Sequence, residues 1–197
     1  MNLDAADHPR GTGLVLVGYR GTGKSTVGRI AADRTGAPFA DADVELERSL
    51  GRSIRSIFEA EGEPAFREHE AGTLARLAAT PGLGGGILAT GGGAILRADN
   101  RRSLRAFGLV VWLTADAETL ARRLAHSRQG LADRPALTAA GTLDEVAAVL
   151  ERRFPLYQAA SDVEVASAGR SVAEVTEAVI RHWDRHRFPA RRGQGVG

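Results

Sequence analysis

Short apolar runs alternate with longer segments of helical period along most of the chain, and this alternation restricts the fold more than any other feature of the sequence. Strands that alternate with helices build βαβ units, in which a parallel sheet is covered by helices on both faces. The predicted strands are residues 14–17, 39–40, 87–89, 109–113 and 163–165, and the predicted helical segments are 24–35, 44–79, 117–125, 142–153 and 171–187. We therefore expect an α/β protein with a five-stranded parallel sheet.

The length of 197 residues fits one domain of ordinary size. We place this domain at residues 14–187, between a polar leader at 1–13, which we expect to be flexible, and a Gly- and Arg-rich tail at 188–197, which we expect to be disordered. Residues 126–137 are polar and lack an apolar period, which indicates a mobile loop over the domain.

Local signals predict several helix ends. Gly36 is a C-terminal stop, and two capping boxes, at 142–145 and 171–174, predict helix starts. Pro64 suits a first-turn position, and Pro155 predicts the end of the helix that begins near 142. The solvated face of the segment 44–79 is expected to carry Glu63, Glu68, His69 and Glu70.

Charge and composition exclude several classes of protein. The chain has 26 basic and 24 acidic residues and a formal net charge of +2, so nucleic acid is not indicated as the main partner. The absence of cysteine excludes disulfides and thiolate metal sites. No apolar run approaches the roughly 18 residues of a membrane helix, and the N-terminus does not follow the order of a signal peptide. We expect a cytoplasmic protein without membrane contact and, because no heptad or paired-repeat pattern occurs, a monomer.

Residues 18–25, GYRGTGKS, match the phosphate-binding loop G-x-x-x-x-G-K-[ST] at every fixed position, between a predicted strand and a predicted helix. The glycines allow successive backbone N–H groups to point at an anion, and the helix that follows adds its positive end. We expect Lys24 to reach the β- and γ-phosphates of a bound nucleotide and the Ser25 hydroxyl to bind Mg²⁺. The predicted nucleotide contacts of the loop are Gly21, Thr22, Gly23, Lys24, Ser25 and Thr26.

Lys24 is the only lysine among the 26 basic residues. Codon bias in a GC-rich genome, which favours arginine, alanine and glycine over lysine, accounts for most of the arginine excess. A compact ammonium group fits among phosphate oxygens in a way that a planar guanidinium does not. The retention of lysine at this one position therefore supports the phosphate-binding interpretation.

A phosphate-binding loop alone does not separate kinases from GTPase switches or ATPase motors. The guanine-specific motif N-K-x-D needs a second lysine, which the chain lacks, and the only D-x-x-G match, residues 33–36, falls in the helix just after the loop. A regulatory GTPase is therefore disfavoured. A small-molecule kinase needs an acceptor pocket, a magnesium ligand and a lid that excludes water.

The sequence offers a candidate for each of these parts. Asp41 and Asp43 follow the second predicted strand, and strand alternation predicts that both carboxylates face the same side at the carboxyl edge of the sheet. Residues 90–93, TGGG, end the third predicted strand, where backbone without side chains permits the close approach of a ligand. Arg134, in the loop 126–137, is a candidate lid arginine for the transferring charge.

Taken together, these residues resemble the shikimate kinase family, whose members phosphorylate the 3-hydroxyl of shikimate with ATP. The resemblance covers about residues 14–180. It rests on an ordered set of motifs, which are GYRGTGKSTVG, FADADVELE, GRSIRSIFEAEGEPAFREHE, ATGGGAI, ADRPAL and ERRFPLY. It implies a three-layer P-loop kinase fold with a mobile lid, ATP and Mg²⁺ as cofactors, and shikimate and ATP as small-molecule partners.

The resemblance also implies roles for residues around the acceptor. Asp41 matches an aspartate that reaches Mg²⁺ through water, and Asp43 matches one that holds the substrate hydroxyls and is a candidate base. Arg67 and Arg153 match two arginines that grip the shikimate carboxylate, for which planar guanidinium groups suit paired hydrogen bonds. The glycine loop is implied to contact the substrate through Gly91, Gly92 and Gly93.

Further roles concern the pocket walls and the nucleotide. Phe58 and Phe66 match walls of the substrate pocket, and Glu70 matches a partner that steadies Arg67. Arg134 matches the lid arginine, which together with Lys24 and Asp43 completes the predicted catalytic set. Arg123 is similar to an arginine beside the adenine. The adenine contact near residues 169–172 stays unassigned, and Ala42 replaces a threonine of many members.

Two alternatives remain open from the residues alone. One is a kinase for another small acidic polyol, such as gluconate, or for a nucleoside monophosphate. The other is a P-loop protein that binds nucleotide as a regulatory or interaction module without turnover. A binding module has no need of a candidate base, two carboxylate-binding arginines and a lid arginine together.

Overall fold

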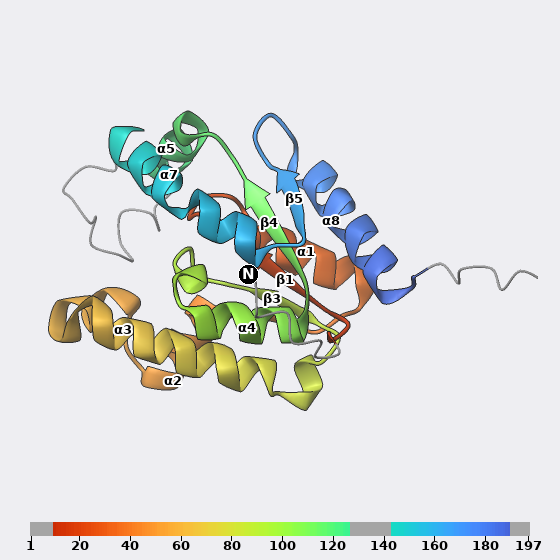
Figure 1. Ribbon diagram of the computed structural model, residues 1–197, viewed down its shortest axis with the longest axis horizontal. Coiled ribbons are helices and arrows are strands. Elements are labelled where there is room, and N and C mark those ends of the chain that lie inside the picture. The colour runs from red at the N-terminus through yellow and green to blue at the C-terminus, as the bar shows by residue number, and fades with distance from the viewer. Residues whose placement is uncertain (1–9, 127–142, 190–197) are drawn as a thin grey trace, which may run out of the picture.

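The computed structural model describes residues 10–126 and 143–189. Five strands form one parallel sheet in the order β2-β3-β1-β4-β5, so the expected sheet is confirmed (Figure 1). The strands are β1 (Gly13–Val17), β2 (Phe39–Asp41), β3 (Ile87–Ala89), β4 (Gly108–Thr114) and β5 (Val163–Ala166). β1, which precedes the phosphate-binding motif, lies at the centre of the sheet.

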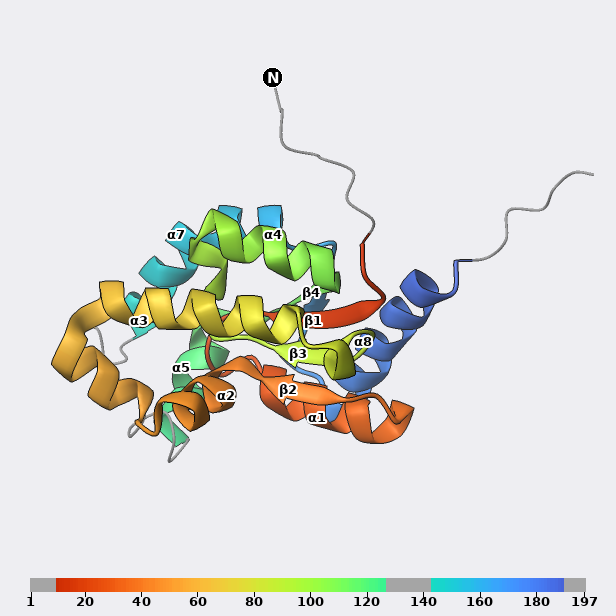
Figure 2. The ribbon, with the colours of Figure 1, turned by 90° about the horizontal axis from the view of Figure 1, so that it is seen from below.

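Helices cover both faces of the sheet, as expected (Figure 2). They are α1 (Lys24–Thr35), α2 (Ala42–Leu50), α3 (Ile54–Ala78), α4 (Ala98–Phe107), α5 (Ala117–His126), α7 (Leu143–Ala160) and α8 (Val172–Arg187), with short 3-10 turns η1 (Pro81–Leu83) and η2 (Ala94–Leu96). α3, α4 and α7 pack on one face, and α1 and α8 pack on the other. None of the described helices is long and apolar enough to cross a membrane.

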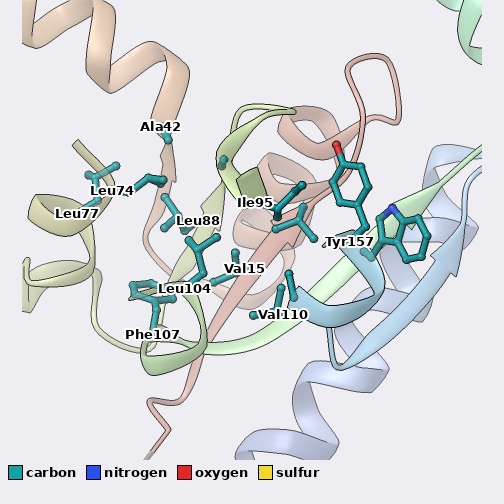
Figure 3. Close-up of a cluster of buried hydrophobic side chains, with 14 of the residues drawn as sticks. Val15, Ala42, Leu74, Leu77, Leu88, Ile95, Leu104, Phe107, Val110 and Tyr157 are labelled. Carbon is teal, nitrogen blue, oxygen red and sulfur yellow. The ribbon is translucent and has the colours of Figure 1, made fainter. Parts of the chain in front are cut away.

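The two faces of β1 explain why its sequence is apolar throughout. Val15 and Val17 point into the cluster formed with α3, α4 and α7, whereas Leu14 and Leu16 point into the cluster formed with α1 and α8. A parallel strand buried on both sides loses the alternation of polar and apolar residues. Tyr157 of α7 lies at the edge of the first cluster, with its hydroxyl turned away from the apolar side chains (Figure 3).

The single helical segment expected at 44–79 is two helices. Gly51 ends α2 in a left-handed conformation with φ 63°, and Ser53 caps α3 by accepting a hydrogen bond from the N–H of Ser56. α3 is itself interrupted at Gly62, where φ is 80° and ψ is 175°, and Pro64 stands just after the break. The apolar period runs across both interruptions, so it does not reveal them.

Glu70 differs from the expected solvated face, because its side chain is only 3% exposed. It accepts a hydrogen bond from Arg67, which provides the compensation that a buried carboxylate requires. Glu63 and Glu68 are exposed as expected.

Three further differences come from tertiary contacts. α4 was not expected, because its sequence carries few apolar residues beyond Leu104 and Phe107. α7 continues through Pro155 to Ala160, since the core buries its last turns. Residues 10–12, expected in the flexible leader, are held to the domain. Their contacts are the ion pair of Arg10 with Asp162, the bond from Gly11 N to the Ala106 carbonyl and the bond from Trp183 Nε1 to the Thr12 carbonyl.

Candidate functional site

The phosphate-binding loop connects the central strand β1 to α1. Gly18, Gly21 and Gly23 have φ angles of 145°, 83° and 95°, which side-chain-bearing residues rarely adopt. A Cβ on Gly18 would also overlap the carbonyl oxygen of Leu113. The loop therefore requires glycine at these positions for conformational reasons. α1 begins at Lys24, directly after Gly23.

Lys24 lies inside this loop. Its side chain is largely buried, with 8% of the residue exposed, and Nζ donates hydrogen bonds to the carbonyls of Gly18 at 2.8 Å and Tyr19 at 3.0 Å. Ser25 and Thr26 are exposed in the first turn of α1. The ammonium group and the N-terminus of the helix thus present positive charge at one place, which suits a phosphate chain.

The glycine loop at 91–93 lies against the phosphate-binding loop. Thr90 ties the end of β3 to β1, because its N–H and its hydroxyl both donate to the Leu16 carbonyl, at 3.1 and 3.2 Å. A Cβ on Gly92 would lie 3.2 Å from the backbone nitrogen of Arg20. The two backbones approach so closely because residue 92 has no side chain.

Two arginines from different helices meet this glycine loop. Arg153 of α7 donates from Nη1 to the Gly92 carbonyl at 3.2 Å. Arg67 of α3 lies against Gly93, where an added Cβ would overlap its guanidinium group. Residues 67 and 153, far apart in sequence, are therefore brought to adjacent glycines. The structure places both predicted carboxylate-binding arginines at the glycine loop, whose Gly92 approaches the phosphate-binding loop.

Carboxylates keep Arg67 charged and oriented. Glu70 accepts from Nη1 at 2.8 Å, and Glu63 accepts from Nε at 3.1 Å and from Nη2 at 2.8 Å. Burial by itself disfavours the charged guanidinium, but Glu70 and Glu63 outweigh it and raise the pKa of Arg67 above its ordinary value. Arg67 therefore remains a cation, which a carboxylate-binding role needs.

The two predicted wall residues differ in exposure. Phe66 is fully buried in a cluster with Leu46, Ile54 and Ile57, which joins α2 to α3. Phe58 is partly exposed, and its ring centroid lies 4.5 Å from that of Phe66. Phe66 is thus mainly a core residue that supports Phe58, and Phe58 is the one of the two that reaches the surface.

The prediction that strand alternation turns Asp41 and Asp43 to the same side is wrong. Asp41 ends β2 and caps α2, accepting bonds at Oδ1 from the N–H groups of Asp43 at 3.0 Å and Val44 at 3.5 Å. Asp43 stands in the first turn of α2, so strand alternation does not place it. Both aspartates still lie at the carboxyl edge of the sheet, since Asp41 is in register with Ala89 of β3.

Arg123 connects the phosphate-binding loop to the segment after β5. It donates to the Gly21 carbonyl at 3.1 Å, to the Ser167 hydroxyl at 3.0 Å and to the Ser167 carbonyl at 2.9 Å. Arg123 thus contacts the phosphate-binding loop and the segment after β5, and its role beside the adenine stays a prediction. Arg134 and the expected lid around it lie outside the described residues, apart from His126 at the end of α5.

Tyr157 is a site residue that the sequence analysis did not identify. Its hydroxyl donates to the Gly92 carbonyl at 2.6 Å, the same oxygen that accepts from Arg153. Its ring is 1% exposed and stacks on Trp112 with centroids 5.4 Å apart. The spacing of four residues between Arg153 and Tyr157 places both on one face of a helix, and this spacing was the available signal.

The fold and the site define a class of protein. A parallel sheet with a phosphate-binding loop after its central strand, facing a second loop bracketed by arginines, is the arrangement of a P-loop phosphotransferase that acts on a small anionic acceptor. The described residues contain no cluster of three or more His, Asp or Glu of the kind that holds a metal by protein ligands alone.

Comparison with known proteins assigns the family. A family model described as shikimate kinase matches residues 20–184. The shikimate kinase of Symbiobacterium thermophilum is 42% identical over 167 residues, which cover 85% of this chain and 93% of that protein. The shikimate kinase of Pseudomonas savastanoi pv. phaseolicola is 44% identical over 152 residues, which cover 77% and 84%. The chain belongs to the shikimate kinase family, and the expected enzyme class, an ATP-dependent kinase, is confirmed.

Solved structures agree with this assignment. Shikimate kinase from Acinetobacter baumannii in complex with shikimate has a TM-score of 0.78 and 33% identity, and the match covers 88% of this chain and 93% of that chain. A gluconokinase from Sinorhizobium meliloti has a TM-score of 0.52 and 20% identity. The second likeness extends to the fold alone.

Proposed function

We propose a division of roles among the site residues for the ATP-dependent phosphorylation of shikimate at its 3-hydroxyl. The phosphate-binding loop holds ATP through the backbone of residues 21–26, and Lys24 contacts the β- and γ-phosphates. The carbonyls that accept from Lys24 Nζ are those of Gly18 and Tyr19, in the same loop. The ammonium group is therefore already positioned beside the phosphate position, at little cost in side-chain freedom.

Shikimate lies between α3 and α7 on the glycine loop at 91–93. The observation that carries this assignment is the approach of Arg67 and Arg153 to adjacent glycines beside the phosphate-binding loop. A carboxylate bound by two guanidinium groups orients the ring. Because the same glycine loop contacts the P-loop backbone, the acceptor hydroxyl is directed toward the γ-phosphate.

Asp43 aligns the 3-hydroxyl and accepts its proton as the oxygen attacks the γ-phosphorus. The bond between the γ-phosphorus and the β,γ-bridging oxygen breaks, and ADP leaves with the electron pair of that bond. Asp43 follows the helix cap Asp41, so its position is fixed by the first turn of α2. Transfer is in line and is favoured by positioning rather than by covalent chemistry.

The residues at this edge fit Mg²⁺. Both capping bonds of Asp41 use Oδ1, which leaves Oδ2 to accept from a magnesium-bound water, and the Ser25 hydroxyl is exposed in the first turn of α1. Mg²⁺ in nucleotide sites usually binds only one or two protein groups, and waters and phosphate oxygens supply its other ligands. When bound, the ion supplies charge neutralisation for the phosphates. Asp41 and Ser25 would hold it at this edge of the sheet.

The remaining roles concern the nucleotide and the exclusion of water. Arg123 steadies the P-loop on the adenine side through its bond to Gly21. Arg134 is assigned to the charge on the transferring phosphoryl group, with the segment around it as the lid. A monomer, a cytoplasmic location and the absence of nucleic-acid partners stay predictions from the sequence.

A substrate-specificity assay tests the assignment. ADP release is measured with shikimate, gluconate and AMP in parallel, and we expect turnover with shikimate to exceed that with the others by orders of magnitude. Arg67→Ala and Arg153→Ala should raise the KM for shikimate at least about tenfold, the loss expected for a charge-assisted bond, while the KM for ATP changes little. An equal rise in both KM values would contradict the carboxylate assignment.

A further inference from the structure

Arg67 is held by two carboxylates of its own helix that differ greatly in exposure. The side chain of Glu70 is 3% exposed, whereas that of Glu63 is 45% exposed. Glu70 accepts a hydrogen bond from Nη1, and Glu63 accepts from Nε and Nη2 through one oxygen. Glu70 is therefore enclosed in the interior of the protein, whereas the side chain of Glu63 is accessible to water.

Glu63 occupies the side of the guanidinium group that a carboxylate ligand prefers. Nε and the neighbouring Nη carry parallel N–H groups, which bind the two oxygens of a carboxylate in paired hydrogen bonds. Arg67 Nη1 faces Glu70, and the outer end of the group lies against Gly93. The side occupied by Glu63 is thus the part of Arg67 that offers two donors together.

The charge balance opposes three carboxylates at one guanidinium group. With shikimate bound, the negative charges near Arg67 would be those of Glu63, Glu70 and the substrate, and Arg153 would share only the last. Negative charges gathered around one guanidinium group repel one another. Glu70 cannot leave at low cost, because it would break a buried ion pair. Glu63 can leave, because its carboxylate is already partly solvated.

The backbone around Glu63 allows this movement. Gly62, directly before it, has φ 80° and ψ 175° and interrupts α3, and Pro64 follows. Glu63 therefore stands at the start of the second part of α3. An acidic side chain at a helix N-terminus is stabilised by the helix dipole. A Glu63 carboxylate released from Arg67 would therefore remain near the positive end of this second part of α3.

We propose that Glu63 is an internal competitor for the substrate carboxylate. It occupies the paired donors of Arg67 in the free enzyme, is displaced when shikimate binds, and so sets the affinity for shikimate. This inference rests on the proposed role of Arg67 as a carboxylate-binding residue. It differs from the role of Glu70, which stays in place and orients Arg67 in both states.

The test compares Glu63→Gln with a matched control on the same helix. Glu59→Gln removes an equivalent ion pair, that of Glu59 with Arg55 at 2.7 Å and spacing i,i+4, which lies outside the proposed site. Shikimate dissociation constants are measured by calorimetry without nucleotide, and KM values for shikimate and ATP are measured by ADP release. Glu63→Ala is the second variant, and a shikimate carboxamide serves as a ligand without the negative charge.

The expected result is a dissociation constant for shikimate about two- to fivefold lower in both Glu63 variants, the range that an exposed ion pair is worth. The control variant, the KM for ATP and the affinity for the carboxamide should not change. An unchanged or higher dissociation constant in the Glu63 variants overturns the inference and assigns Glu63 a purely orienting role. Arg67→Ala, measured in parallel, separates the two proposals, because wild-type affinity in that variant would instead refute the carboxylate role of Arg67.

Discussion

Replacing Tyr157 with phenylalanine tests how much one hydroxyl contributes to holding the glycine loop. The variant keeps the ring, which is 1% exposed and stacked on Trp112, and removes the 2.6 Å hydrogen bond to the Gly92 carbonyl. Arg153 still donates to that oxygen at 3.2 Å, so the carbonyl keeps one partner. The loss should therefore be that of an ordinary hydrogen bond, about 1 kcal/mol, rather than that of an orphaned buried group.

The consequences are expected in both stability and substrate affinity. A loss of about 1 kcal/mol lowers the Tm of a domain of this size by roughly 2–4 °C. Because Gly92 lies between Arg153 and the P-loop, the KM for shikimate should rise by about fivefold if the whole loss appears in binding. The KM for ATP should stay within about a factor of two, because the carbonyl of Gly92 faces α7.

The assays are a thermal melt and initial-rate kinetics with each substrate varied in turn. Thr176→Val is the matched control, because Thr176 is 0% exposed and its hydroxyl donates to the Val172 carbonyl at 2.8 Å, on the opposite face of the sheet. The control should lose stability without a change in either KM. An unchanged KM for shikimate in Tyr157→Phe, with the Tm lowered, would refute the idea that the hydroxyl positions the glycine loop.

The ionisation of Tyr157 adds a dependence on pH. Burial raises the pKa of Tyr157 well above its ordinary value, so the hydroxyl remains a donor at neutral pH. A group with a raised pKa in the folded state contributes stability that is complete below its unfolded pKa, about 10 for tyrosine, and is lost as the pH rises further. The free energy of unfolding should decline above that pH in the wild type and decline less steeply in Tyr157→Phe.

Two predictions concern the reacting groups. Lys24→Met should reduce kcat by at least about a hundredfold, because it removes the ammonium group at the phosphate position, and circular dichroism should confirm a native fold; near-normal turnover would contradict the P-loop assignment. Asp43→Asn should reduce kcat by about 10²- to 10⁴-fold, the usual contribution of a general base, while ATP binding by calorimetry stays measurable. An active Asn variant would leave Asp43 no role in proton transfer.

Local sequence signals predicted the elements whose ends are fixed by nearby residues. Gly36 ends α1 in a left-handed conformation with φ 69°, and Ser171 with Glu174 forms the expected capping box of α8. β3 was predicted to the residue, because both faces of the sheet bury it and its apolar run ends at polar or glycine residues. These features depend on contacts between residues a few positions apart, so the sequence predicts them without knowledge of the fold.

Other boundaries depend on partners far away in sequence. α7 continues past Pro155 because Tyr157 and Ala160 are buried in the core, which outweighs the unfavourable proline. Asp43 belongs to a helix because Asp41 caps α2, and neither the apolar period nor strand alternation distinguishes that turn from a longer strand. Glu70 is buried where α3 places it beside Arg67.

The sequence by itself determined the chemistry that this protein can perform. The phosphate-binding loop, with the only lysine of the chain, the aspartate pair and the ordered motifs predicted the family, because these residue types at these spacings serve few other purposes. Only the tertiary structure decided how the acceptor side is built. Arg67 of α3 and Arg153 of α7 are separated along the chain, and they meet only because both contact the loop that follows β3, at Gly93 and Gly92. The competition of Glu63 for Arg67 exists only in that arrangement.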